Sequence, residues 1–351
     1  MTSAIKRVIV TGGAGFIGSA VARNFVNELG YEVFVIDKLT YAGSLDSVRS
    51  IRDNPRFHFH HVDICDEAAV NDVFRLAQPD GVLHLAAESH VDRSITHARA
   101  FVDTNVAGTF TLLDAFRGHI SRNPGAAGTA RFLHVSTDEV FGALGADGLF
   151  TEASPYDPSS PYAATKAAAD HLARAWHRTY GLPIVISNCS NNFGPYHFPE
   201  KLIPLTILSA LEGRPIPVYG TGANVRDWLY VDDHVRALAR ILWSGIPGES
   251  YNIGGGNERR NIDVVRKICE LMDRMHPVGA PHDRLIRFVE DRPGHDYRYA
   301  IDSRKLQGAL GWTPAETFET GLEKTVAWYL ANQDWWEPIR ADTYRGERLG
   351  L

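Results

Sequence analysis

The segment that decides the fold of this chain is Arg7-Val8-Ile9-Val10-Thr11-Gly12-Gly13-Ala14-Gly15-Phe16-Ile17-Gly18. A β-branched run leads into glycines at both the G-x-G-x-x-G and the G-x-x-G-x-x-G spacing, and a helical pattern follows over residues 17–29. Such a strand–turn–helix lets the backbone approach a pyrophosphate, which the helix N-terminus attracts through its amide groups. The segment predicts a dinucleotide site with Gly12, Gly15 and Gly18 in its turn.

The next strand outward supplies an acidic residue at the position that such a site requires. Asp37 stands 19 residues after Gly18, at the end of the apolar run 32–36. Its carboxylate can accept a hydrogen bond from the 2′-hydroxyl of an adenosine ribose and would repel a 2′-phosphate. The pattern therefore favours NAD over NADP, although Lys38 beside it reduces that repulsion.

The first half of the chain alternates short β-branched runs with longer helical patterns. This alternation predicts an α/β fold, a doubly wound parallel-sheet Rossmann domain, with a smaller mixed α/β C-terminal substrate lobe. We expect residues 1–188 to form the NAD-binding domain, with returning segments at about 226–252 and 297–312, and residues 189–351 to form mainly the substrate lobe, which the resemblance described below implies binds a nucleotide sugar. Strands are predicted at 7–11, 32–36, 57–62, 81–85, 131–136 and 183–188, and helices at 17–29 and 67–77.

Composition excludes several classes of partner. The net charge of −6 argues against nucleic acid and against an anionic membrane surface. No apolar run approaches the length of a membrane span, and the first residues lack the apolar region of a signal peptide. Three widely spaced cysteines, Cys65, Cys189 and Cys269, fit a reducing compartment, so a cytoplasmic protein is expected. The cluster His58-Phe59-His60-His61 lies on a predicted strand, and we expect no metal site.

A second motif carries redox chemistry. Ser159-Ser160-Pro161 reads as a helix start, which places Tyr162 and Lys166 four residues apart on one helical face. A nearby ammonium and a cationic nicotinamide both favour the phenolate, so that Tyr162 can exchange a proton with a sugar hydroxyl during hydride transfer.

A third motif is a pair of acids, Asp138 and Glu139, after the largely apolar run 132–135. Neighbouring residues of a regular strand point to opposite faces of a sheet, so the two acids can cooperate only if the strand has ended. Burial would raise the pKa of Asp138 and keep it protonated, as a general acid requires.

These motifs resemble the extended short-chain dehydrogenase/reductase family and, within it, the dTDP-glucose 4,6-dehydratases, from about residue 6 to residue 335. The strings that carry the resemblance are 37–43 (DKLTYAG), 84–92 (HLAAESHVD), 136–142 (STDEVFG), 162–166 (YAATK), 191–195 (NNFGP), 226–234 (RDWLYVDDH) and 292–296 (RPGHD).

The resemblance implies a dehydration coupled to transient oxidation. Oxidising C4 of the hexose makes the C5 hydrogen acidic; water then leaves across C5–C6 and the hydride returns to C6. It implies Asp138 as general acid, Glu139 as general base, Thr137 as a hydrogen-bond partner of O4, and Tyr162 and Lys166 in the redox step. It also implies a homodimer through the helix that carries Tyr162 and a preceding helix near 105–116.

The same resemblance assigns the two binding sites. Around NAD it places Gly12, Gly15, Phe16, Ile17, Gly18, Asp37, Lys38, Leu39, Thr40, Asp63, Ile64, Leu85, Ala86, Ala87, Glu88, Ser89, Thr104, Tyr162, Lys166 and Asn192. Around the nucleotide sugar it places Ser89, Thr137, Asn191, Lys201, Leu202, Pro217, Val218, Tyr219, Arg226, Asn261, Asp291, Arg292, Pro293, Gly294 and His295.

Three other interpretations stay open. A nucleotide-sugar 4-epimerase would need the glycine turn, Tyr162 and Lys166, but no acid/base pair beside C5 and C6. A non-catalytic NAD-sensing protein would need none of the four reactive side chains. A dehydratase for UDP-glucose differs by one methyl group on the base, which an apolar pocket discriminates by only about 1–3 kcal/mol.

Overall fold

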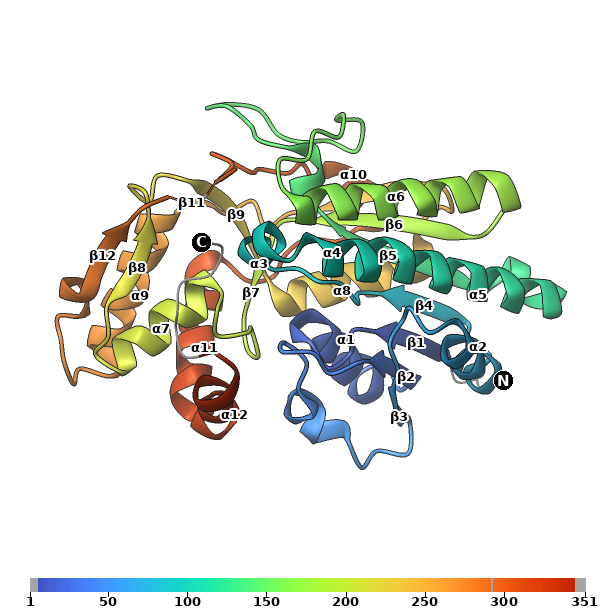
Figure 1. Ribbon diagram of the computed structural model, residues 1–351, viewed down its shortest axis with the longest axis horizontal. Helices are drawn as coiled ribbons and strands as arrows, with labels where there is room; N and C mark the ends of the chain where they lie inside the picture. Colours follow the sequence, from blue (N-terminus) through green and yellow to red (C-terminus); the bar gives the residue numbers. More distant parts are fainter. Residues whose placement is uncertain (1–5, 292, 345–351) are drawn as a thin grey trace.

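A seven-stranded parallel sheet forms the centre of the larger lobe in the computed structural model of the chain, which describes residues 6–291 and 293–344 (Figure 1). The strand order is β10-β6-β5-β4-β1-β2-β3, so the order reverses between β1 and β4. In an open sheet of this kind, ligands bind beyond the carboxyl ends of the strands at the reversal. The strands are β1 (Arg7–Thr11), β2 (Glu32–Asp37), β3 (Phe57–His61), β4 (Gly81–His84), β5 (Arg131–Thr137), β6 (Ile184–Cys189) and β10 (Ser250–Ile253).

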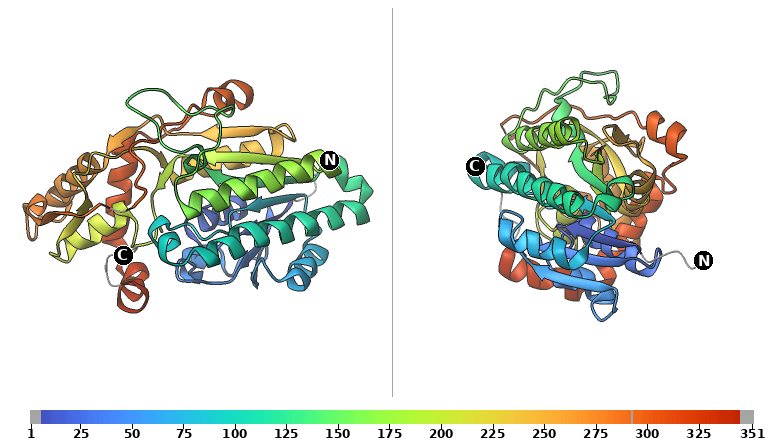
Figure 2. Two further views of the ribbon diagram at one scale, coloured as in Figure 1. Left: turned by 45° about the horizontal axis from the view of Figure 1, so that its top comes forward. Right: turned by 90° about the vertical axis from the view of Figure 1, so that its right-hand side faces the viewer.

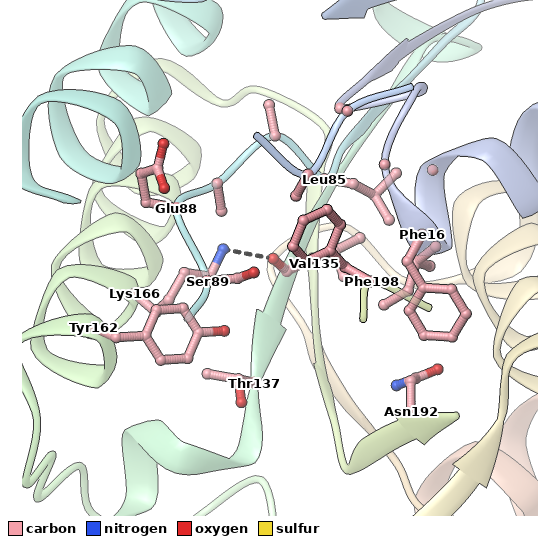
Figure 3. Close-up of a pocket in the computed structure, with 18 of the residues that line it drawn as sticks. Phe16, Leu85, Glu88, Ser89, Val135, Thr137, Tyr162, Lys166, Asn192 and Phe198 are labelled. Carbon is pink, nitrogen blue, oxygen red and sulfur yellow. Dashed lines mark hydrogen bonds between the residues drawn. The ribbon is translucent and has the colours of Figure 1, made fainter. Parts of the chain in front are cut away.

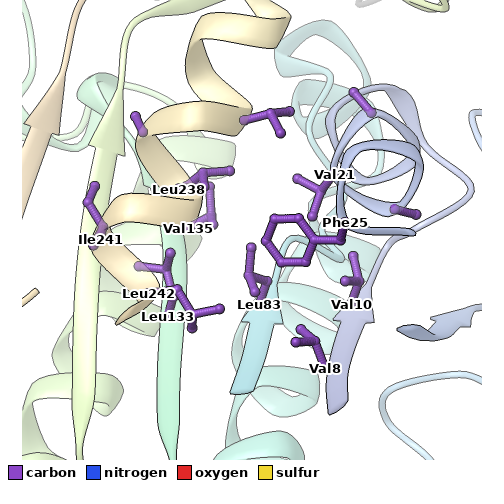
Figure 4. Packing of buried hydrophobic residues seen from close by; sticks show 14 of the residues in the cluster. Val8, Val10, Val21, Phe25, Leu83, Leu133, Val135, Leu238, Ile241 and Leu242 are labelled. Atoms are coloured by element: carbon purple, nitrogen blue, oxygen red, sulfur yellow. The ribbon is translucent and has the colours of Figure 1, made fainter. Parts of the chain in front are cut away.

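Helices cover both faces of this sheet, which explains why its strands are apolar almost throughout. One face packs against α2 (Glu67–Ala77), α5 (Thr109–Arg122) and α6 (Pro161–Tyr180). The other face packs against α1 (Phe16–Asn27), α8 (Val231–Ser244) and α10 (Arg304–Leu310). Figure 4 shows the second core, where Phe25 of α1 and Leu238 of α8 lie over side chains of β1, β4 and β5.

The smaller lobe lies beyond the carboxyl edge of the sheet and has its own apolar core (Figures 1 and 2). A three-stranded sheet and a two-stranded parallel sheet contribute to it, together with four helices. These elements are β7 (Asn191–Phe193), β9 (Val225–Tyr230) and β11 (Glu258–Arg260); β8 (Ile216–Tyr219) and β12 (Ile286–Val289); and α7 (Leu202–Leu211), α9 (Asn261–Met275), α11 (Phe318–Ala331) and α12 (Gln333–Pro338).

Short helical segments complete the described chain. They are α3 (Val91–Thr96), α4 (Ala98–Phe101), the 3₁₀ segments η1 (Leu45–Ile51), η3 (Pro124–Gly128), η4 (Asp138–Phe141) and η5 (His282–Leu285), and the π-helical segments η2 (Val102–Gly108) and η6 (Ile339–Thr343). Within residues 6–291 and 293–344, no helix is long and apolar enough to cross a membrane.

The first returning segment begins later than the expected residue 226. Residues 225–230 form β9, which pairs with β7 and β11 in the small sheet and not with the large one. The chain returns to the large sheet only with α8 and β10, whose residue Ser250 pairs with Ile186 of β6. The difference arises because β9 follows the glycine-containing turn 220–222 on the lobe, where its apolar residues complete that lobe's core.

Ser160 begins α6, the helix that carries Tyr162 and Lys166. Its hydroxyl accepts a hydrogen bond of 3.1 Å from the amide of Ala163, and Pro161 occupies the first helical turn. Replacing Ser160 with alanine removes this cap, so we expect the free energy of unfolding to fall by about 1 kcal/mol, measured by urea titration. Ser160→Asn can cap equally well and is the matched control; an equal loss in both variants would contradict the assignment.

Candidate active site

Two cavities open at the carboxyl edge of the large sheet, and they share one wall. The first, of about 350 Å³, runs from the glycine turn after β1 to Tyr162 on α6. The second, of about 460 Å³, extends from the end of β5 into the smaller lobe. The residues that line both are Ser89, Glu139, Asn191, Glu200, Lys201, Leu202 and Trp228.

The glycine turn forms the floor of the first cavity, and its backbone is packed too closely for side chains. Gly12 has a φ of +71°, and a Cβ there would lie 2.8 Å from the backbone nitrogen of Ala86. A Cβ on Gly18 would lie 2.1 Å from the carbonyl oxygen of Gly12. The turn therefore presents bare backbone and the N-terminus of the twelve-residue helix α1 to the cavity, as a bound pyrophosphate requires.

Asp37 lies at the end of β2 and is held in place by the backbone. Its carboxylate accepts hydrogen bonds from the amides of Ala14 (2.9 Å) and Leu39 (2.8 Å), and it lines the first cavity. Lys38 extends toward Thr104, at 3.1 Å, and Asp63, at 3.5 Å. Because Asp63 balances the charge of Lys38, the lysine offers less attraction to a 2′-phosphate than its place in the sequence indicates.

The acid pair lies where β5 has ended. Thr137 is the last residue of the strand, and its hydroxyl accepts a hydrogen bond from the amide of Glu139 at the start of the 3₁₀ segment η4. The 3₁₀ turn removes the strand's alternation, so that both Asp138 and Glu139 line the first cavity. Glu139 also lines the second cavity and stands at the junction between them.

Asp138 has the electrostatic properties of a general acid. The residue is only 1% exposed, and burial, followed by repulsion from the carboxylates of Glu139 and Asp227, raises its pKa well above the ordinary range; the charge of Arg226 opposes this rise. The hydroxyl of Thr137 approaches its Oδ1 at 3.4 Å. A carboxyl group in this environment keeps its proton near neutral pH.

Tyr162 and Lys166 line the first cavity from α6, opposite the end of β5 (Figure 3). The Nζ atom of Lys166 donates a hydrogen bond of 2.7 Å to the carbonyl oxygen of Val135. Burial, followed by repulsion from Glu139, raises the pKa of Tyr162 well above its ordinary value, whereas burial lowers the pKa of Lys166. The protein surroundings of Tyr162 therefore favour the neutral phenol, which a nearby cation must offset before the residue can act as a base.

The second cavity carries cationic and aromatic groups for an anionic, ring-bearing ligand. Arg226 of β9 is 5% exposed, donates to the carbonyl oxygens of Val225 and Asp296, and lies 4.3 Å above the ring of Tyr299. Tyr219 of β8 donates from its hydroxyl to Asp92 at 3.0 Å and lies edge-on to His295. A buried guanidinium beside an aromatic surface suits a nucleoside diphosphate.

The two cavities bring together most of the residues expected at the site. The first is lined by Thr137, Asp138, Glu139, Tyr162, Lys166, Gly12, Gly15, Phe16, Ile17, Gly18, Asp37, Lys38, Thr40, Ile64, Leu85, Ala86, Ala87, Glu88, Ser89, Thr104 and Asn192. The second is lined by Ser89, Asn191, Lys201, Leu202, Pro217, Val218, Tyr219, Arg226, Asn261 and His295.

Of the expected residues that the structure describes, five lie outside both cavity walls: Leu39, Asp63, Asp291, Pro293 and Gly294. Leu39 has a φ of +52°, and its amide donates a hydrogen bond to the carboxylate of Asp37 in the turn after β2. Asp63 forms an ion pair with Lys38 and accepts a hydrogen bond from the amide of Cys65. Asp291 contacts the cavity wall through His295, whose Nδ1 lies 2.6 Å from its carboxylate. Pro293 and Gly294 belong to the same turn, and Arg292 lies outside the described residues.

Several residues that line the cavities are not among the expected site residues: Tyr41, His90, Asp92, Cys189, Ser190, His197, Phe198, Glu200, Arg214, Trp228, Tyr299, Arg340 and Tyr344. Four of them, Tyr41, His90, Asp92 and Trp228, stand inside the motif strings, which could have indicated them. Others have no such signal and meet the site through packing, as Glu200 does through its 2.9 Å ion pair with Arg93 of α3.

The histidine cluster of β3 serves the sheet edge. His58 pairs with Glu32 at 3.0 Å, and His61 approaches the carbonyl oxygen of Lys38 at 3.1 Å. Among residues 6–291 and 293–344, no group of three or more histidine, cysteine, aspartate or glutamate side chains could hold a metal ion.

Comparison with known proteins gives consistent matches over nearly the whole chain. Residues 9–325 match the family model described as GDP-mannose 4,6 dehydratase. A probable dTDP-glucose 4,6-dehydratase of Sinorhizobium fredii is 60% identical, covering 98% of this chain and 99% of the relative. The dTDP-glucose 4,6-dehydratase of Neisseria meningitidis is 57% identical, covering 99% of each chain.

Among solved structures, both dehydratases and epimerases of nucleotide sugars are similar to this chain. The dTDP-glucose 4,6-dehydratase DesIV of Streptomyces venezuelae, crystallised with NAD and TYD bound, is similar with a TM-score of 0.88 and 45% identity, covering 95% of this chain and 99% of that one. A UDP-glucose 4-epimerase of Thermus thermophilus in complex with NAD is similar with a TM-score of 0.82 and 30% identity, covering 93% and 99%.

Proposed function

The chain belongs to the nucleotide-sugar 4,6-dehydratases, and on this premise we propose that it converts dTDP-glucose to dTDP-4-keto-6-deoxyglucose with NAD as its cofactor. The observation that carries the proposal is that a tyrosine–lysine pair for hydride transfer and a pair of acids for proton transfer line the same cavity. Tyr162 and Lys166 face the acid pair Asp138 and Glu139, and Glu139 also reaches the cavity of the smaller lobe. An enzyme that only oxidised its substrate would not need the acid pair.

The residues of the first cavity fit NAD. The side-chain-free turn at Gly12 and Gly18 accommodates a pyrophosphate against α1, and Asp37 offers a carboxylate at the end of β2. When bound, NAD would serve as the acceptor of the hydride from C4 of the hexose and as its later donor to C6.

The side chains divide the proton transfers between them. Thr137 holds O4, and Tyr162, as the phenolate that Lys166 stabilises, takes the proton of the C4 hydroxyl and becomes a phenol. Once C4 is a ketone, the C5 hydrogen lies α to a carbonyl, and Glu139 removes it as a proton. Asp138, protonated because it is buried, gives its proton to the departing C6 hydroxyl, so that water leaves. Glu139 then returns its proton to C5, and O4 stays a ketone oxygen. Tyr162 holds the proton taken from O4 and Asp138 has lost one, so the transfer of one proton from Tyr162 to Asp138 through solvent restores the enzyme.

The direct test is incubation of the purified protein with dTDP-, UDP-, CDP- and GDP-glucose, followed by mass spectrometry. A product of dTDP-glucose lighter by one water, with no net consumption of NAD, is the expected result. A product of unchanged mass would indicate epimerisation and overturn the proposal. Faster turnover of UDP-glucose than of dTDP-glucose would overturn the choice of thymidine.

The epimerase interpretation shares the scaffold but does not use the acid pair. Epimerases need the glycine turn and a Tyr–Lys pair, both of which this chain has, and their structures are similar to it at lower identity than the dehydratases. A buried, protonated carboxyl group beside Glu139 has a role in expelling water and none in transferring a hydride at C4. The acid pair therefore favours dehydration.

We also propose that the protein is a homodimer that buries the outer faces of η2, α5 and α6. Three large apolar side chains lie exposed on these elements: Val102 and Phe110, each 46% exposed, and Tyr180, also 46% exposed. Phe110 packs edge-on against Trp176 of α6, which joins the two helices in one apolar surface.

We propose a cytoplasmic location for the protein. All three cysteines, Cys65, Cys189 and Cys269, are free thiols, which fits a reducing compartment.

Replacing Phe110 with aspartate is expected to convert the dimer to a monomer, because a carboxylate would be buried without a partner at the centre of the interface. Sedimentation velocity measures the change. Phe288 of β12, 58% exposed at the far end of the smaller lobe, supplies the matched control, since Phe288→Asp should leave the mass unchanged. A wild-type monomer, or dimers of both variants, would contradict this interface.

A further inference from the structure

A buried polar cluster centred on Asp170 lies behind Lys166 and touches the first cavity through Ser136. Asp170 follows Lys166 by one helical turn on α6, so Tyr162, Lys166 and Asp170 share one face of the helix. Asp170 is fully buried, and it belongs to neither cavity wall. The mechanism described above does not use it.

The carboxylate of Asp170 is held by donors from several elements. Its Oδ2 accepts hydrogen bonds from the hydroxyls of Ser136 (2.9 Å) and Tyr156 (2.8 Å), and the amide of Asn188 approaches at 3.5 Å. Its Oδ1 lies 3.0 Å from Nε2 of His134, which is also fully buried. Burial raises the pKa of Asp170, but the interaction with His134, followed by the charge of Lys166 and the hydrogen bond from Tyr156, outweighs it and lowers the pKa below its ordinary value, so the group carries a negative charge.

This charge needs a balancing cation, and His134 does not provide it. Burial, followed by repulsion from Lys166, lowers the pKa of His134, so its imidazole is neutral near neutral pH. A buried carboxylate without a counter-charge is costly. Lys166 and Arg174 each lie one helical turn from Asp170 on the same face, and the half-buried Arg174 donates to the hydroxyl of Tyr156 at 2.8 Å. Lys166 is the buried cation of the two, and the attraction of Asp170 is the largest effect that opposes the lowering of its pKa by burial.

We propose that Asp170 is a positioning residue for the redox step: its buried carboxylate, fixed by Ser136, Tyr156 and His134, holds Lys166 as an ammonium ion against Tyr162. The proposal rests on the proposed function, since it concerns the same Tyr–Lys pair. Its physical basis is that a lysine buried to 4% exposure, with a backbone carbonyl as hydrogen-bond acceptor, loses its proton readily unless a fixed negative charge lies near it.

Asp170 acts on Lys166 as a negative charge, whereas the neighbouring thiol, imidazole and phenol groups are neutral. Burial raises the pKa of the Cys189 thiol to about 12, so that it stays neutral, and burial keeps His84 neutral by lowering its pKa well below the usual value. Tyr162 is a neutral phenol in its protein surroundings. The groups that face this region are Tyr162, Asp170 and Arg174 from α6, His134 from β5, His84 from β4, Cys189 from β6, Tyr156 from the preceding loop, and Asp138 and Glu139 from η4.

The test is the titration of Lys166 itself, followed in protein labelled with ¹³C at lysine Cε and assigned by the signal missing from Lys166→Met. Removing the carboxylate in Asp170→Asn takes away an attraction over about 6 Å, so the pKa of Lys166 should fall by roughly 1–2 pH units. Activity on dTDP-glucose requires the ammonium, so the alkaline limb of the kcat profile should move to lower pH by a similar amount, while KM stays unchanged because Asp170 touches neither cavity.

Tyr156→Phe is the matched control, because it removes one donor to Asp170 and keeps the charge. A purely structural role predicts equal effects of Asp170→Asn and Tyr156→Phe, and that result would overturn the proposal. So would a wild-type Lys166 that is already neutral at pH 7, a measurement that does not depend on the folding of Asp170→Asn. Because the titration requires no substrate, failure of the proposed function would show as absent turnover with the Lys166 shift intact.

Discussion

Replacing Glu139 with glutamine is expected to lower the rate of 4-keto-6-deoxy product formation by about 10²–10⁴-fold, the usual contribution of a general base. Glutamine keeps the size of the side chain at the junction of the two cavities, where Glu139 meets the end of β5, but it cannot accept a proton. Oxidation at C4 does not require this base. Reduced nicotinamide should therefore accumulate on the enzyme, visible by its absorbance, while no product lighter by one water appears.

A solvent-isotope experiment separates Glu139 from its neighbour. In deuterated water, Asp138→Asn should still exchange the C5 hydrogen of dTDP-glucose, because its base is intact, although water cannot leave without an acid. Glu139→Gln, in contrast, should neither exchange the C5 hydrogen nor release water. Exchange at the wild-type rate in Glu139→Gln would show that another group removes the C5 proton and would refute the assigned role.

Replacing Tyr162 with phenylalanine is expected to abolish the first oxidation, again by about 10²–10⁴-fold. The ring of Tyr162 packs edge-on against Phe101 in a small apolar cluster, so phenylalanine preserves the packing and removes only the hydroxyl. Single-turnover mixing with dTDP-glucose measures the effect, and in this variant no reduced nicotinamide should form. The contrast with Glu139→Gln, in which it accumulates, orders the two steps.

Tyr31 gives a matched control for this variant. It lies immediately before β2, away from the carboxyl edge, and its ring packs against Phe25 and Trp243. Tyr31→Phe should form reduced nicotinamide at the wild-type rate. Undiminished oxidation in Tyr162→Phe would remove the tyrosine from the mechanism and leave Lys166 or a water molecule to take the proton.

The elements around the acid pair show which features of the structure local sequence patterns can predict. Predicted strands such as 7–11 and the helix 67–77 coincide with β1 and α2, and β5 ends at Thr137, as cooperation of Asp138 and Glu139 requires. These features depend on neighbours within a few residues, which is why periodicity, glycines and caps indicate them. The later start of the return to the large sheet depends on which sheet β9 joins, and no local pattern specifies that choice.

The sequence by itself determined the class of fold, the glycine turn and the spacing of Tyr162 and Lys166, because each is set by backbone conformation over a few consecutive residues. The tertiary structure decided the electrostatics of the site. Only packing removes water from Asp138 and brings Arg226, 88 residues away in the chain, close enough to influence its proton. Only packing places His134 and Ser136 of β5 around Asp170, because burial and long-range charge arise from segments that meet after the chain has folded.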